Sequence, residues 1–231
     1  MKILTIIPAR CGSKGIKDKN IIDVCGKPLI SYSIDLSLEL KKDNLVDTIL
    51  VSTDCEKISN IAKEYGADVP FLRPENISND TAKSIEYYLH ALDFYKKQNI
   101  SFDAVLLLQP TSPLRTFELL KNAIVIFKSK NKDSLISVYK EEYINDLVMY
   151  KNTTDVDLKP LNKNHNKGVR RQDHGSIFVR NGAIYLTKVS YILEKQLIIS
   201  DNPLFIEMKK NDSLNIDTIE DLELVRKTLC K

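Results

Sequence analysis

Residues 1–20 read MKILTIIPARCGSKGIKDKN. The apolar run that ends at Pro8 is typical of a buried strand, and an irregular loop with two glycines follows it. In open α/β sheets ligands bind at the carboxyl ends of strands, where this loop would lie. Glycines let the backbone approach phosphate oxygens, and basic side chains offset phosphate charge. The basic residues of the loop are Arg10, Lys14, Lys17 and Lys19. A solvated basic surface loop has the same composition, so this stretch alone leaves both interpretations open.

Strand-like apolar runs alternate with helix-like amphipathic segments along most of the chain. Strands are expected at residues 2–8, 46–52, 68–72, 104–108, 134–139 and 183–186. Helices are expected at 29–41, 56–65, 81–97, 119–127 and from 218 onward. This alternation predicts a three-layer α/β fold, in which helices cover both faces of a mostly parallel sheet. Right-handed crossovers would then bring the loops at 10–20, 73–84 and 109–115 together at one cleft.

Length and composition limit the classes of protein. The 231 residues suffice for one α/β domain, expected to span 1–231. The 34 basic and 31 acidic residues nearly balance, which argues against a nucleic-acid or membrane-surface partner. No run approaches the roughly 18 apolar residues of a membrane span, and the N-terminal run lacks a signal-peptide cleavage site. A cytoplasmic protein is expected.

The cysteines and histidines show no recognisable ligand spacing. With no CxxC pair among Cys11, Cys25, Cys55 and Cys230, we expect reduced thiols and no disulfide framework. The sequence contains no Walker A motif, no GxGxxG motif and no Ser/His/Asp arrangement. P-loop phosphotransfer, dinucleotide binding and a covalent nucleophile of the serine type therefore have no support in the sequence.

Residues 140–178 interrupt the alternation with a polar segment rich in asparagine and lysine. An irregular segment of this length inside a compact domain is usually functional or bound to a partner. A disordered loop is the alternative.

A second stretch, at residues 107–115, reads LLQPTSPLR. Together with the first loop it resembles the acylneuraminate cytidylyltransferases, which make CMP-sialic acids and related CMP-nonulosonates. Further blocks of this family occur in its order, namely KPLI at 27–30, VSTD at 51–54, FLRP at 71–74, NDTA at 79–82, RQ at 171–172, NGAIY at 181–185 and IDT at 216–218. The resemblance covers nearly the whole chain. It implies a Rossmann-like nucleotidyltransferase fold and transfer of CMP from CTP to a nine-carbon α-keto acid sugar.

The resemblance also implies roles for individual residues. Those expected to hold the nucleotide are Arg10, Ser13, Lys14, Lys19, Asn20, Arg73, Asn79 and Ser84. Those expected on the sugar side are Gln109, Thr111, Ser112, Arg171, Gln172 and Asn181. Among them Arg171 suits the acceptor carboxylate, because a guanidinium is a planar two-pronged donor. The expected catalytic residues are Arg10, Lys19 and Asp217, whereas Asp54 and Arg115 are expected to brace loops.

Asp217 is the expected carboxylate ligand of Mg²⁺ or Mn²⁺, since Mg²⁺ takes one or two carboxylates together with phosphate oxygens and water. Many relatives read Asp-Ile-Asp here, but this chain reads Asn215-Ile216-Asp217. Asn215 offers a carbonyl oxygen without a charge, so metal affinity would be weakened. An N-cap of the last helix is the alternative role for Asp217.

In the resembling family, the region corresponding to 140–178 forms an arm that packs on a second subunit and helps complete its sugar site, so a homodimer is expected. The acceptor is left open among N-acetylneuraminate, legionaminate and pseudaminate. A Kdo-type cytidylyltransferase and a non-catalytic nucleotide-binding relative are the alternative functions.

Overall fold

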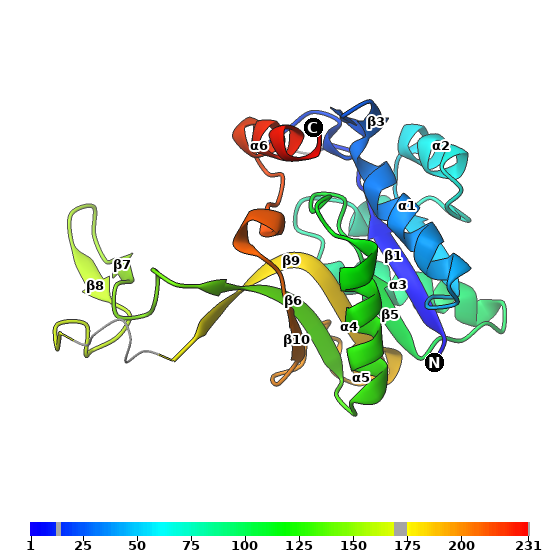
Figure 1. Cartoon of the computed structure of the whole chain (residues 1–231). Helices are drawn as coiled ribbons and strands as arrows, with labels where there is room; N and C mark the ends of the chain where they lie inside the picture. The colour runs from blue at the N-terminus through cyan, green and yellow to red at the C-terminus, as the bar shows by residue number, and fades with distance from the viewer. Residues whose placement is uncertain (13–14, 169–174, 231) are drawn as a thin grey trace.

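The computed structural model describes residues 1–12, 15–168 and 175–230. Its centre is a six-stranded sheet with the order β10-β6-β9-β5-β1-β4 (Figure 1). The strands are β1 (Ile3–Pro8), β4 (Thr48–Ser52), β5 (Ala104–Leu107), β6 (Ser134–Glu141), β9 (Ile177–Lys188) and β10 (Leu204–Glu207). Strand β9 runs antiparallel to both of its neighbours, and the other pairings in this sheet are parallel. The mostly parallel sheet is therefore confirmed, and the reversed β9 is an addition to it.

Helices cover both faces of the sheet, as expected for three layers. They are α1 (Leu29–Lys42), α2 (Glu56–Glu64), α3 (Ser84–Lys97), α4 (Phe117–Ser129), α5 (Val189–Lys195) and α6 (Ile219–Leu229). Successive residues of a strand point to opposite faces. Ile3 and Ile7 of β1 accordingly pack in a core with α1, α2 and α4, whereas Leu4 and Ile6 pack in a second core with α3 and α5. None of the helices in the described ranges is long and apolar enough to cross a membrane.

The strand expected at 68–72 is wrong. Asp68 forms one isolated parallel bridge with Leu50, and no strand continues from it. Pro70 lies two residues later, and proline lacks the backbone N–H that a continuing ladder needs.

A disulfide joins Cys25 to Cys230, so the expectation of four reduced thiols is also wrong. Cys25 lies in the turn of a hairpin formed by β2 (Asp23–Val24) and β3 (Lys27–Pro28), and Cys230 follows α6. A third hydrophobic cluster packs this hairpin against α6, with Val24 and Val225 fully buried. Tertiary packing therefore brings together two cysteines that are 205 residues apart, and their spacing in the sequence carries no sign of it.

An arm extends from the body of the molecule (Figure 1). The paired strands β6 and β9 lead into it, and a small hairpin of β7 (Tyr150–Asn152) and β8 (Leu158–Pro160) lies within it. Glu141 anchors its base, because its buried carboxylate accepts hydrogen bonds from the backbone N–H groups of residues 142 and 143, both at 2.9 Å. The described part of the segment 140–178 thus contains short paired strands, which turns and irregular stretches connect.

Candidate nucleotide site

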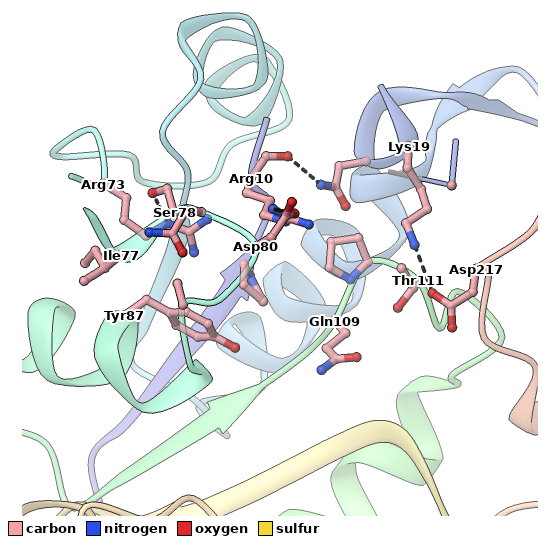
Figure 2. A pocket seen from close by; sticks show the side chains of 16 residues that line it. Arg10, Lys19, Arg73, Ile77, Ser78, Asp80, Tyr87, Gln109, Thr111 and Asp217 are labelled. Atoms are coloured by element: carbon pink, nitrogen blue, oxygen red, sulfur yellow. Dashed lines mark hydrogen bonds and ion pairs between the residues drawn. The ribbon is translucent and has the colours of Figure 1, made fainter. Parts of the chain in front are cut away.

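A cleft of about 420 Å³ opens at the carboxyl ends of β1 and β5 (Figure 2). Its lining residues come from the loop after β1, the segment between β4 and α3, α3 itself and the loop after β5. The segment that leads into α6 contributes Asp217. The lining residues are Pro8, Arg10, Gly15, Lys19, Asn20, Arg73, Ile77, Ser78, Asn79, Asp80, Ala82, Tyr87, Gln109, Pro110, Thr111 and Asp217. The three loops that the topology predicted to meet do meet here.

At one end of the cleft the loop after β1 is held against the segment that leads into α6. Lys19, in the short 3-10 helix η1 (Lys19–Ile21), donates from Nζ to the Ile216 carbonyl at 2.9 Å and to Asp217 Oδ1 at 3.0 Å. A Cβ atom on Gly15 would lie 2.6 Å from the Asp217 carbonyl oxygen, so only glycine allows this approach. The predicted cation and the predicted carboxylate therefore face each other.

The other end is built from Arg73, Ser78 and Tyr87 (Figure 2). Arg73 Nε donates to Ser78 Oγ at 2.9 Å, and the guanidinium lies 5.4 Å from the centre of the Tyr87 ring. Burial lowers the pKa of Arg73 and raises the pKa of Tyr87 to about 12. At neutral pH the guanidinium remains charged, because the pKa of arginine starts so high, and the phenol stays protonated. This end consequently offers hydrogen-bond donors beside an aromatic face.

Asp54 and Arg115 brace loops, as expected. Asp54 Oδ1 accepts from the Cys11 backbone N–H at 2.8 Å and lies 4.0 Å from an Arg73 terminal nitrogen. The buried Arg115 donates from Nη1 to the Ala183 carbonyl at 2.8 Å, which ties the loop after β5 to β9. Burial lowers the pKa of Arg115 to about 9, which still leaves it charged at neutral pH.

Cys11 lies near the cleft but is a poor nucleophile. The pKa of the Cys11 thiol is raised to about 11, mainly by a hydrogen bond with the Cys55 side chain and secondly by burial. Because the thiolate is the nucleophile, Cys11 is almost entirely in its unreactive, protonated form at neutral pH.

Four of the predicted residues do not line the cleft: Ser84, Ser112, Asn181 and Asn215. The Asn181 side chain is occupied elsewhere, since its Oδ1 accepts from Ser137 Oγ at 2.6 Å and its Nδ2 donates to Ser213 Oγ at 2.8 Å. Substrate contacts by these four residues stay predictions. The predicted residues Ser13, Lys14, Arg171 and Gln172 lie outside the described part of the chain.

Sequence reasoning gave no role to Ser78, Asp80 or Tyr87, which all line the cleft. Asp80 belongs to the NDTA block at 79–82, but the sequence does not indicate whether a polar loop side chain points into the cleft or to solvent. Tyr87 has the spacing of a core residue on a helix, and only the packing of α3 shows that it also borders the cleft.

The residues around Asp217 fit a divalent metal ion that takes most of its ligands from outside the protein. The Asp217 side chain is 66% exposed and faces the cleft, and its Oδ2 accepts from Asn215 Nδ2 at 2.9 Å. Thr218 caps α6 in a capping box with Asp221, so the alternative role of Asp217 as the N-cap is wrong. Among the described residues no group of three His, Cys, Asp or Glu side chains comes together. An ion here would therefore take one carboxylate and complete its shell with phosphate oxygens and water.

The sequence matches the Cytidylyltransferase family over residues 4–228. A pseudaminic acid cytidylyltransferase from Campylobacter jejuni is 36% identical over 226 residues, covering 98% of this chain and 95% of the relative. A CMP-N,N'-diacetyllegionaminic acid synthase from Legionella pneumophila is 32% identical over 249 residues, covering 99% and 97% respectively. The solved structure of a CMP:2-keto-3-deoxy-manno-octonic acid synthetase complexed with CTP shares the fold, with a TM-score of 0.72 and 17% identity over 100% of this chain and 99% of that one. With a full-length family match and relatives of this similarity, the chain belongs to the cytidylyltransferase family.

Proposed function

We propose that this protein transfers CMP from CTP to the anomeric hydroxyl of a nine-carbon α-keto acid sugar and releases pyrophosphate. The observation that carries the proposal is the single cleft that joins Arg10 and Lys19 to Asp217 at the ends of the sheet strands. The Campylobacter and Legionella relatives support a nonulosonate as the acceptor.

The cleft suits a nucleoside triphosphate laid along its length. The cytosine would lie at the end formed by Arg73, Ser78 and Tyr87, and the triphosphate would lie toward Lys19. Asn20 Nδ2 donates to the Arg10 carbonyl at 3.1 Å and thereby fixes the backbone from which the Arg10 side chain reaches into the cleft. The sugar would approach over Gln109 and Thr111.

In the reaction the acceptor hydroxyl gives its proton to water and its oxygen bonds to the α-phosphorus, while the bond between the α-phosphorus and the bridging oxygen breaks and its electron pair leaves with the pyrophosphate. The leaving pyrophosphate gains negative charge, which fixed cations stabilise most effectively when they are already oriented. Lys19 meets this requirement, because its ammonium is held by Ile216 and Asp217 and its side chain is only 15% exposed.

A divalent ion held by Asp217 and the triphosphate would act as a Lewis acid on the phosphoryl oxygens. Asn215 would support it indirectly, since its Nδ2 donates to Asp217 Oδ2 and its Oδ1 accepts from Ser112 Oγ at 3.3 Å. The Asn215 amide in this arrangement fixes the rotamer of the carboxylate.

Pyrophosphate release tests the proposed function. The protein is incubated with each of the four ribonucleoside triphosphates, with Mg²⁺ or Mn²⁺ or neither, and with pseudaminate, diacetyllegionaminate, N-acetylneuraminate or Kdo. Release is expected with CTP, a nonulosonate and a divalent ion together. Turnover with CTP and Kdo but with no nonulosonate would indicate a Kdo-type cytidylyltransferase. CTP binding without turnover on any acceptor would indicate a non-catalytic relative.

We further propose that the arm mediates a homodimer. It exposes apolar side chains that a monomer in water would leave uncovered, such as Tyr143 at 70%, Val156 at 89% and Leu158 at 65%. Sedimentation at micromolar concentration is expected to give the mass of two chains. Changing Val156 and Leu158 to serine should shift the equilibrium toward the monomer, whereas the same change at Leu193, an exposed leucine on α5, should leave it unaltered. A monomeric wild-type protein would exclude the proposed dimer.

A further inference from the structure

Both cations that the proposed function directs toward the triphosphate are paired with carboxylates. Lys19 Nζ lies 3.0 Å from Asp217 Oδ1, and Arg10 Nη1 lies 2.6 Å from Asp80 Oδ1. The first pair belongs to the metal end already described. The second involves a carboxylate that has no role in the proposed reaction.

The Arg10–Asp80 pair bridges two separate loops across the cleft. Arg10 follows β1, whereas Asp80 lies between the 3-10 helix η2 (Glu75–Ile77) and α3. In Figure 2 the pair lies in the middle of the view, with Arg73 and Tyr87 on one side and Lys19 and Asp217 on the other. A nucleotide that spans the cleft would pass this pair.

A guanidinium binds carboxylate and phosphate oxygens with the same planar fork, so the two kinds of anion would compete for the N–H groups of Arg10. The backbone of Arg10 is fixed by Asn20, which leaves the side chain as the part able to change partner. The two side chains are 32% and 41% exposed, so an incoming anion can reach the pair. The charge on Asp80 would in addition repel a polyphosphate nearby.

We propose that Asp80 is a competing carboxylate, which pairs with Arg10 and is displaced from it by the triphosphate. This proposal rests on the proposed function and adds to it a residue that sets the affinity for the phosphate chain. Asp80 lowers the affinity for both triphosphate and pyrophosphate, and it recaptures Arg10 as the product leaves. A residue of this kind favours turnover by preventing the product from remaining bound.

The test is Asp80→Asn, assayed by calorimetric binding of inorganic tripolyphosphate and of pyrophosphate without divalent metal. The variant is expected to bind both about five-fold more tightly, the upper end of what a partly exposed ion pair contributes. The matched control is Asp18→Asn, which removes the same charge from a carboxylate that pairs with Lys57 at 3.1 Å and does not line the cleft. Its affinity should change less than two-fold.

A double-mutant cycle separates competition for Arg10 from simple repulsion. In an Arg10→Ala background, Asp80→Asn should tighten tripolyphosphate binding clearly less than it does in the wild-type background, because only the repulsion by the Asp80 charge then remains to be removed. Unchanged or weaker binding by Asp80→Asn in the wild-type background would overturn the proposal and make Asp80 a residue that orients Arg10. Tripolyphosphate carries neither base nor sugar, so a wrong assignment of CTP or of the acceptor would leave this result intact.

Discussion

Lys19→Ala is expected to lower kcat/KM for CTP by about 100- to 1,000-fold, the cost of removing one oriented donor from a site of developing charge. Two of the three ammonium N–H donors contact the Ile216 carbonyl and Asp217 Oδ1, which leaves a third for a phosphate oxygen. The same substitution removes the hydrogen bonds that connect η1 to Ile216 and Asp217. Asp217 would then be held less firmly, so the Mg²⁺ concentration for half-maximal rate should also rise. Steady-state kinetics at varied CTP and Mg²⁺ measures both effects.

The matched control for this variant is Lys57→Ala. Lys57 also pairs with an aspartate, Asp18, but it lies on α2 outside the cleft and is 65% exposed. Its removal should change kcat/KM less than two-fold. If Lys19→Ala kept near-normal turnover with a folded circular-dichroism spectrum, the phosphate-binding assignment of the loop after β1 would be wrong.

Breaking the disulfide is expected to lower the free energy of unfolding by about 5 kcal/mol, because the bond closes a very long loop in the unfolded chain. For a protein of this size that corresponds to a fall in Tm of roughly 10 °C. The measurement is thermal unfolding of the wild type with and without a reducing agent, beside the variant Cys25→Ser/Cys230→Ser.

The reducing agent should shift the Tm of the wild type and leave that of the variant unchanged. Cys11→Ser/Cys55→Ser is the control, since both residues are free thiols, and it should keep the sensitivity to reduction. An equal Tm of the wild type under both conditions would show that the bond adds nothing to stability.

The parts of the fold that the sequence predicted are those encoded locally. Strand β5 is a continuous apolar run, and alternate residues of it pack in the cores on the two faces of the sheet. The helix ending before Gly66 and the capping box at Thr218 were likewise readable from single residues. Strand β10 and the direction of β9 were not, because pairing partners and strand direction depend on residues far away in the chain.

The candidate site divides in the same way. Arg10, Lys19 and Asp217 were expected from ordered sequence blocks, and the sheet topology explained why distant loops would meet. The contact between Lys19 and Asp217 could not be predicted, because it depends on how the two segments pack in the folded protein. No local sequence pattern records that packing. The same holds for Asp80, whose partner Arg10 is 70 positions earlier in the numbering.

The covalent link between Cys25 and Cys230 also orders the events of biosynthesis. A ribosome completes Cys230 only 205 residues after Cys25, when every strand of the central sheet has already been made. The β2–β3 hairpin therefore has no α6 to cover Val24 until that helix has been synthesised. Asp217 directly precedes the N-cap of that helix, so it is the last of the residues that line the cleft to be synthesised. A nascent chain that lacks α6 therefore cannot yet form the complete cleft.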